Sequence, residues 1–165
     1  MYPEMRRKDR LMQEDRAREL LAGGEYGILS MVSGDGQPYG VPLSYVVLEG
    51  DIYFHCAMDG QKIRNLSHEA RVSFCVVGET QPVFESNDFS TYYESVIVFG
   101  TAQMVEEESQ KTVALMALCQ KYLPEHMEHA GASIQHYGKR TGVWRIAVEH
   151  ITGKAKPRPI GQSMD

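Results

Sequence analysis

Hydrophobic and polar residues alternate along several stretches of the chain, as they do in strands that bury one face. The first two stretches are residues 26–33 and 38–48, joined by the turn Gly34-Asp35-Gly36. Similar runs cover residues 51–56, 71–77, 92–105 and 142–152. Because turn residues separate most of these runs, the pattern predicts six antiparallel strands.

Three other segments show the spacing of helices. Apolar residues recur at helical intervals over residues 11–21, before Gly23-Gly24, and a short polar helix is expected near residues 61–68. Three acidic residues, at 106–108, mark the start of a third helix, which Pro124 ends. The histidine-rich segment after Pro124 and the polar residues 79–91 are both expected to be loops.

Six mostly antiparallel strands with two or three helices predict a closed or split β-barrel of the α+β or all-β class. We expect a single domain over residues 1–157 and a flexible tail over residues 158–165. Pro42 lies inside the second strand and cannot donate to a ladder, so that strand is expected at an edge, at a bulge or opened locally. Gly100 predicts a bulge or bend in the fifth strand, residues 92–105.

The composition limits the classes of partner. A formal net charge of −5 and a pI near 5.7 argue against general binding to nucleic acid or to an anionic membrane surface. The three cysteines are widely spaced, which fits a reducing compartment better than a disulfide framework. No apolar run is long enough to span a bilayer. We therefore expect a cytoplasmic protein that binds neither nucleic acid nor membrane.

A strand, a glycine turn and a polar helix follow one another between Tyr53 and Leu66. This junction brings free backbone N–H groups, Gly60 and the mobile charge of Lys62 to one place, a combination that can hold a phosphate. His55 lies on the strand just before the junction, and alternation directs it away from the main core. These features also occur in loops that bind nothing, so they do not define a site by themselves.

Two further candidate sites are weaker. His126, His129 and His136, with Glu125 and Glu128 beside them, have side chains that could bind a metal ion. No rigid element is evident to hold these ligands in place, so we predict no metal site. A Cys56 nucleophile with His55 as base fails because adjacent strand residues point to opposite faces.

The order of several segments is recognisable. They are Met5-Arg6-Arg7-Lys8-Asp9-Arg10, Gly40-Val41-Pro42-Leu43-Ser44-Tyr45, Tyr53-Phe54-His55-Cys56-Ala57 with Gly60 and Lys62, Val72-Ser73-Phe74, Ser95-Val96-Ile97-Val98-Phe99-Gly100 and Ile151-Thr152-Gly153-Lys154-Ala155. This arrangement resembles the pyridoxamine 5′-phosphate oxidase-like FMN-binding split-barrel family, and within it the 5-nitroimidazole resistance protein branch.

The resemblance implies a mainly β (α+β) fold, a six-stranded antiparallel split β-barrel with flanking helices. It also implies a homodimer that binds FMN at the subunit interface. It implies that Pro42, Leu43, Ser44 and Tyr45 pass along the isoalloxazine edge and that His55, Cys56 and Ala57 flank the ring and ribityl chain. By the same likeness Gly60 and Lys62 bind the phosphate, Ser95 contacts the cofactor from the next strand, and Trp144 and Lys154 approach from the partner. Gln61 stands where a second cation is expected, so pyridoxamine phosphate is not the expected substrate.

The function implied is an FMN-dependent oxidoreductase of small electron-poor substrates such as nitroimidazoles, with a reduced nicotinamide as donor. His55 is the candidate proton donor or substrate contact, and the alternative is that it only hydrogen-bonds the backbone or flavin. The alternative function is a non-catalytic flavin- or haem-binding carrier or sensor. Haem would need a strand histidine as ligand, either His55 or His150, and alternation sets His150 on the face of Trp144.

Overall fold

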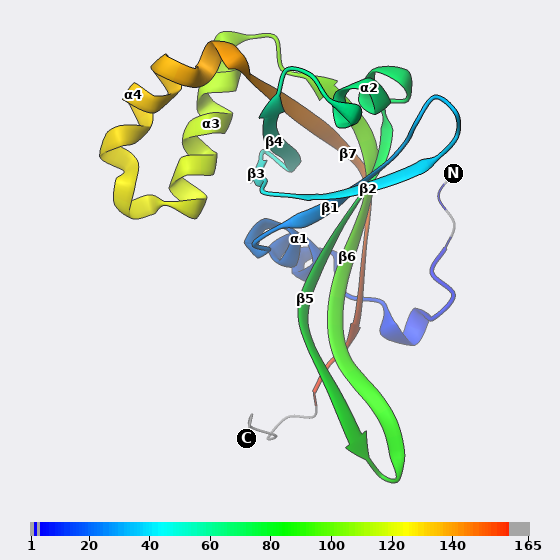
Figure 1. The fold of residues 1–165 in the computed structure, drawn as a ribbon. Helices are drawn as coiled ribbons and strands as arrows, with labels where there is room; N and C mark the ends of the chain where they lie inside the picture. Colours follow the sequence, from blue (N-terminus) through cyan, green and yellow to red (C-terminus); the bar gives the residue numbers. More distant parts are fainter. Residues whose placement is uncertain (1, 3, 159–165) are drawn as a thin grey trace.

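The computed structural model describes residues 2 and 4–158, which form a curled antiparallel sheet of seven strands (Figure 1). The sheet is a half-barrel, as the split-barrel prediction requires, and its strand order is β2-β1-β5-β6-β7-β4-β3. The strands are β1 (Gly27–Val32), β2 (Pro38–Leu43), β3 (Val46–Leu48), β4 (Asp51–Ala57), β5 (Arg71–Glu85), β6 (Asp88–Met104) and β7 (Thr141–Lys156).

The seventh strand arises because the predicted strand 38–48 is broken in two at Ser44 and Tyr45. Tyr45 is fully buried, and its backbone N–H donates to the Tyr122 hydroxyl, 2.9 Å away, instead of to a neighbouring strand. β2 and β3 therefore form the two opposite edges of the sheet, although only two residues separate them in the chain. Pro42 lies on the edge strand β2, as predicted, opposite Ile28.

Four α-helices flank the sheet: α1 (Glu14–Gly23), α2 (Gln61–His68), α3 (Glu108–Tyr122) and α4 (Met127–Tyr137). The loop predicted after Pro124 is wrong, because His129 and His136 lie on α4. Ala130 and Ile134 are apolar and lie one turn apart on α4. Ala130 is buried, and Ile134 packs against the hydrophobic cluster beneath α3. Burial of two residues at this spacing favours a helix. No helix among the described residues is long and apolar enough to cross a membrane.

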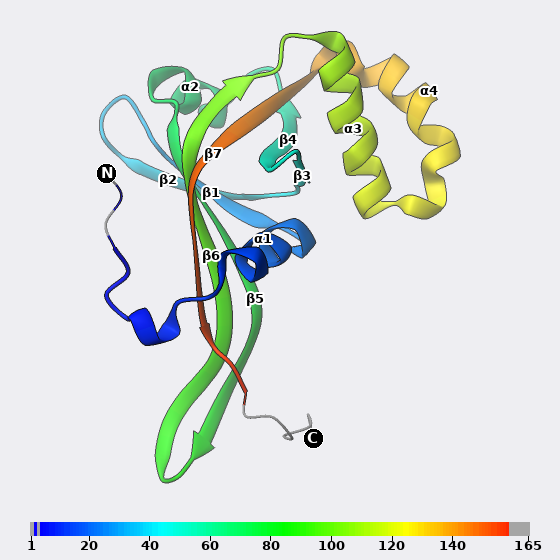
Figure 2. The same ribbon diagram turned by 180° about the vertical axis from the view of Figure 1, so that it is seen from behind.

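The loop predicted over residues 79–91 is also wrong. β5 and β6 continue through this segment as an extended hairpin that projects from the body of the molecule (Figures 1 and 2). Its polar residues pair along the hairpin, and the turn is made by Ser86 and Asn87, both with positive φ. The predicted tail, residues 158–165, lies outside the described residues except for Arg158, whose guanidinium is 3.6 Å from Glu79.

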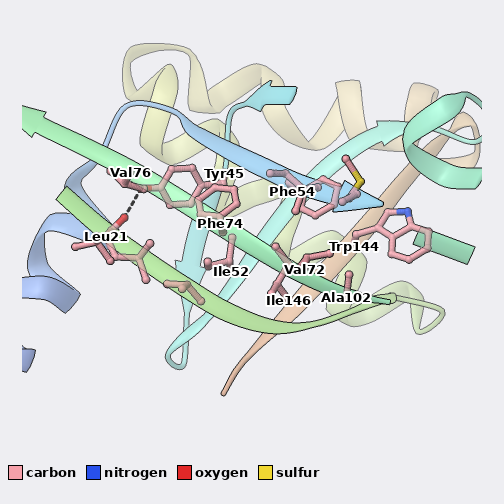
Figure 3. Close-up of a cluster of buried hydrophobic side chains, with 14 of the residues drawn as sticks. Leu21, Tyr45, Ile52, Phe54, Val72, Phe74, Val76, Ala102, Trp144 and Ile146 are labelled. Carbon is pink, nitrogen blue, oxygen red and sulfur yellow. Dashed lines mark hydrogen bonds between the residues drawn. The ribbon is translucent and has the colours of Figure 1, made fainter. Parts of the chain in front are cut away.

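The main core fills the inner face of the curled sheet and is closed at one end by α1 (Figure 3). Its largest fully buried side chains include Tyr45, Phe54 and Phe74. A second, smaller cluster lies beneath α3, where Tyr53 packs with Val143 and the apolar face of that helix. Tyr53 and Phe54 therefore serve different clusters, as expected of neighbours on a strand.

A bulge lies where Gly100 predicts one. The register between β6 and β7 shifts after Phe99, which pairs with His150, while Gly100 pairs with Val148. A Cβ at Gly100 would lie 2.1 Å from the backbone oxygen of Ala147, so the close approach requires glycine. The bulge also moves His150 to the outer face beside Phe99, and the expectation that it shares a face with Trp144 is wrong.

Candidate functional site

The end of β4 has one open backbone edge. β7 pairs with β4 from Ile52 to Ala57, but β3 pairs with it only as far as Tyr53. On the β3 side, residues 54–57 therefore have no neighbouring strand. This is where the sheet splits, and unpaired strand groups are available there to a ligand.

Lys62 lies on the first turn of α2, just beyond this edge. Its ammonium nitrogen is 5.4 Å from the centre of the Phe54 ring, and it forms no ion pair with any residue that the structure describes. The N-cap residue of α2 is Gly60, which has φ +137° and no side chain. The first N–H groups of α2 are therefore without a capping side chain. A half-buried cation beside an uncapped helix N-terminus attracts an anion.

Asn65 adds an independent sign of a missing partner. It is 3 % exposed, and its side-chain amide nitrogen has no hydrogen-bond partner; within residues 2 and 4–158 no other side-chain polar atom is both buried and unpartnered. It lies three residues after Lys62 on the same helix face, and helical side chains lean towards the N-terminus. The orphaned donor is therefore on the side of α2 that carries the cation.

His55 occupies the open edge of β4, outside the main core as expected. Its side chain is exposed, yet desolvation by surrounding protein atoms lowers its pKa, and the charge of Lys62 lowers the pKa further. The imidazole is therefore neutral near pH 7, with one N–H donor and one acceptor nitrogen. Burial raises the pKa of the Cys56 thiol, against an opposite effect of Lys62, and Cys56 packs towards the core.

The link between β2 and β3 is held by the end of α3. The Tyr122 hydroxyl accepts from the Tyr45 N–H and lies 2.7 Å from the carbonyl oxygen of Glu25. The Lys121 ammonium donates to the carbonyl oxygen of Gly24 at 2.8 Å and lies 4.0 Å from the centre of the Tyr45 ring. These contacts hold Ser44 and Tyr45 next to the open edge of β4. Burial of the Lys121 ammonium lowers its pKa.

Lys121, Tyr122 and Asn65 were not among the residues predicted from the sequence. Tyr122 and Lys121 act across 77 residues or more of sequence, and no local pattern marks them. Asn65 did have a signal, since it is a polar residue between Ile63 and Leu66 on the buried side of α2.

Ser95 and Lys154 lie together but far from Lys62. They are directly opposite each other in the β6–β7 ladder, on the face of the sheet turned away from the core. His55 pairs with Val143 near the other end of β7. At about 3.3 Å per residue, the strand from Val143 to Lys154 spans roughly 36 Å. β7 also separates β6 from β4, so in one chain Ser95 is not on the strand next to His55.

Trp144 is placed in the core of its own chain. It pairs with Phe54 in the β4–β7 ladder and is 7 % exposed (Figure 3). Little of its surface is left for a cofactor or for a second subunit.

The residues present fit an organic phosphate. They supply an unpaired cation, uncapped N–H groups and an orphaned amide donor at one end of a strand whose edge is open. Among the described residues, no group of three His, Cys, Asp or Glu side chains could hold a metal ion.

Comparison with family models identifies the class of protein. The model for pyridoxamine 5′-phosphate oxidase matches residues 13–155. The chain belongs to this family. Comparison with curated proteins finds no match.

Solved structures show the same fold. A conserved hypothetical protein from Mycobacterium tuberculosis is 20% identical, with a TM-score of 0.78 over 97% of this chain and 99% of that one. A candidate 5-nitroimidazole antibiotic resistance protein from Bacteroides thetaiotaomicron is 19% identical, with a TM-score of 0.74 over 87% and 85%. An FAD and heme binding protein from Mycobacterium smegmatis is 20% identical, with a TM-score of 0.76 over 89% and 74%.

Proposed function

We propose that the protein is a homodimeric flavoprotein whose residues 1–157 form a single FMN-binding domain. In this proposal it reduces small, flat, electron-poor substrates such as nitroimidazoles with electrons from a reduced nicotinamide. The observation that carries the proposal is the unpaired Lys62 cation beside the uncapped start of α2 and the open edge of β4. Family membership supports a flavin, as does the similarity to the FAD and heme binding protein, although the latter also binds heme.

The phosphate of FMN would lie at Lys62 and the N–H groups that follow Gly60. A charge-assisted hydrogen bond from Lys62 is worth about 1.5–3 kcal/mol. FMN fits these residues without requiring more cations, because it has a single phosphate group. The segment from Pro42 to Tyr45 would pass along the ring edge, and the backbone of Cys56 and Ala57 would face the ring from the open edge of β4.

Two chains would be needed to complete the site. Lys62 and His55 lie at one end of β7 and Ser95 with Lys154 near the other, roughly 36 Å apart along the strand. One FMN molecule can meet both groups only if they come from different subunits. Ser95 and Lys154 of the partner subunit would then close the side that one chain leaves open.

When bound, the flavin would supply the redox chemistry by accepting a hydride from the nicotinamide and delivering two electrons to the substrate. The chain would position the substrate and donate a hydrogen bond to it. A neutral His55 can donate a hydrogen bond from its ring N–H to a nitro oxygen, and its lowered pKa keeps it neutral at pH 7.

Haem is the competing cofactor, and His150 is a poor ligand for it. Its ring stacks on Tyr2, with centroids 4.8 Å apart, and it lies beside Phe99, so a planar porphyrin would have to displace this stack. His55 is the remaining strand histidine. The absorption spectrum of the purified protein decides between the cofactors, because a Soret band without flavin bands would overturn the proposal.

Single-turnover reoxidation tests the reaction. Protein loaded with FMN is reduced anaerobically and mixed with a nitroimidazole, for the wild type and for His55→Ala. We expect the wild type to be reoxidised and the variant to react at least about tenfold more slowly, as loss of a hydrogen bond to the nitro group predicts. No reoxidation of the wild type contradicts a nitroimidazole reductase, and equal rates remove His55 from the reaction.

A further inference from the structure

The hairpin formed by residues 79–93 extends beyond the rest of the sheet (Figures 1 and 2). We call it the arm. β1 pairs with β5 only as far as Cys75, and the pairing of β7 with β6 ends at Tyr93. The arm is therefore a two-stranded ribbon, about 20 Å long, with no further strand on either edge. Within its own chain, Lys156 contacts Ser90 and Glu85. Isolated two-stranded hairpins are marginally stable in water, so an arm of this length needs a surface to lie on.

The tip of the arm carries two exposed aromatic rings. Phe84 is 61 % exposed and Phe89 is 85 % exposed, and their ring centroids are 4.8 Å apart. No described part of the chain covers them. Two adjacent phenylalanines at the end of a projecting hairpin have the character of interface anchors.

Phe84 and Phe89 lie on the same face of the sheet as Ser95 and Lys154, the residues proposed to complete the cofactor site of the partner. Side chains alternate along β6, so Phe89, Tyr93 and Ser95 share one face, and Phe84 is opposite Phe89. The exposed apolar residues Val77 and Ile97 continue this face into the body of the sheet. A second subunit that brings its site to Ser95 and Lys154 would therefore also face the arm.

The region around α2 is chemically suited to receive the tip. Met58 is 52 % exposed next to this helix, and a methionine sulfur packs well against aromatic rings. The guanidinium of Arg64 pairs with Asp59 at 3.3 Å, and its exposed face can lie over a ring.

Charge also matches at the tip. Glu79 and Glu85 of the arm pair with Arg158 and Lys156 of their own chain, but Asp88 has no cationic partner among the described residues. In residues 57–68, Arg64 pairs with Asp59, and Lys62 is the cation left to face an acid.

We propose that the arm of each subunit crosses to the other subunit and lays Phe84 and Phe89 against residues 55–68 of the partner, at the rim of its cofactor site. This inference rests on the proposed homodimer with FMN at the interface. In it the arm does two things: it holds the dimer together and it shields one side of the partner's site from solvent.

Photo-crosslinking tests this contact. A benzoylphenylalanine is placed at position 89, and a matched control probe at position 113, an exposed apolar position on α3. Isotope-labelled and unlabelled chains are mixed before irradiation, so that links between subunits are recognised by mixed isotope composition. We expect the probe at 89 to yield mixed links to residues 55–68 and the probe at 113 to yield none there.

Three results overturn the inference. They are links from position 89 within its own chain, links to another part of the partner, and a protein that is monomeric in solution. The proposed cofactor is judged separately, by FMN titration of the wild type, so a failed arm contact with normal FMN binding leaves the proposed function standing. As a second variant, Phe84→Ser/Phe89→Ser should raise the dimer dissociation constant on the order of a hundredfold, whereas Val113→Ser should leave it unchanged.

Discussion

The ammonium nitrogen of Lys62 lies over the ring of Phe54, 5.4 Å from its centre. A side chain of the first turn of α2 is thereby held against the strand that ends in His55, Cys56 and Ala57. The contact holds the end of β4 and the start of α2, on either side of Gly60, against each other. It also keeps Lys62 close enough to His55 for its charge to lower the pKa of the imidazole.

The first prediction concerns this electrostatic link. Replacing Lys62 by Met removes a positive charge that disfavours protonation of the imidazole, so the pKa of His55 should rise towards its ordinary value. NMR titration of the His55 ring protons measures it. Arg64→Met is the control and should leave the pKa of His55 unchanged. An unchanged pKa in Lys62→Met would show that the two side chains do not interact.

The second prediction is that Asn65 lowers the stability of the fold and strengthens FMN binding. An unpartnered buried donor costs about 1–3 kcal/mol, so Asn65→Leu should raise the free energy of unfolding by about 1 kcal/mol. Leucine has the same branching and number of side-chain heavy atoms as asparagine, although it is larger, and it has no donor. The same variant should weaken FMN binding by about tenfold, since a hydrogen bond to a charged group is lost. Urea denaturation and flavin titration measure the two effects. A less stable variant would mean that the Asn65 amide already has a partner.

Tyr122 should act as a positioning residue for the segment before β3. Tyr122→Phe keeps the ring but leaves the buried Tyr45 N–H without its acceptor, which should lower the free energy of unfolding by about 1–2 kcal/mol. We also expect faster hydrogen exchange at the Tyr45 amide and severalfold weaker FMN binding. Tyr137→Phe, the same change at an exposed position on α4, is the control. Lower stability with normal exchange and normal FMN affinity would reduce Tyr122 to a structural role.

Much of the fold could be predicted because alternation and turn residues are local signals. The turn after β1, the span of α2 and the bulge at Gly100 are all marked by neighbouring residues. The break at Ser44 and Tyr45 could not be seen, because a hydroxyl 77 residues away produces it. Residues 79–91 have the pattern of a loop because the two strands of the arm pair mainly with each other and have little apolar surface to bury, so they lack the hydrophobic alternation of a core strand.

The candidate site could be predicted in part for the same reason. His55, Gly60 and Lys62 are close in sequence, and a strand end followed by a helix start brings them together whatever the rest of the chain does. Ser95 and Lys154 are brought together by the β6–β7 register, and their distance from His55 depends on the strand order. That order is a property of the whole sheet and has no local signature.

The most direct test of the account is titration of the purified protein with FMN, followed by quenching of flavin fluorescence, for the wild type, Lys62→Ala and the matched control Gln61→Ala. We expect one FMN per chain, wild-type affinity in Gln61→Ala, and an affinity at least about tenfold lower in Lys62→Ala. Absence of quenching with the wild type, or equal affinities for the wild type and Lys62→Ala, would contradict a flavin phosphate site at the start of α2.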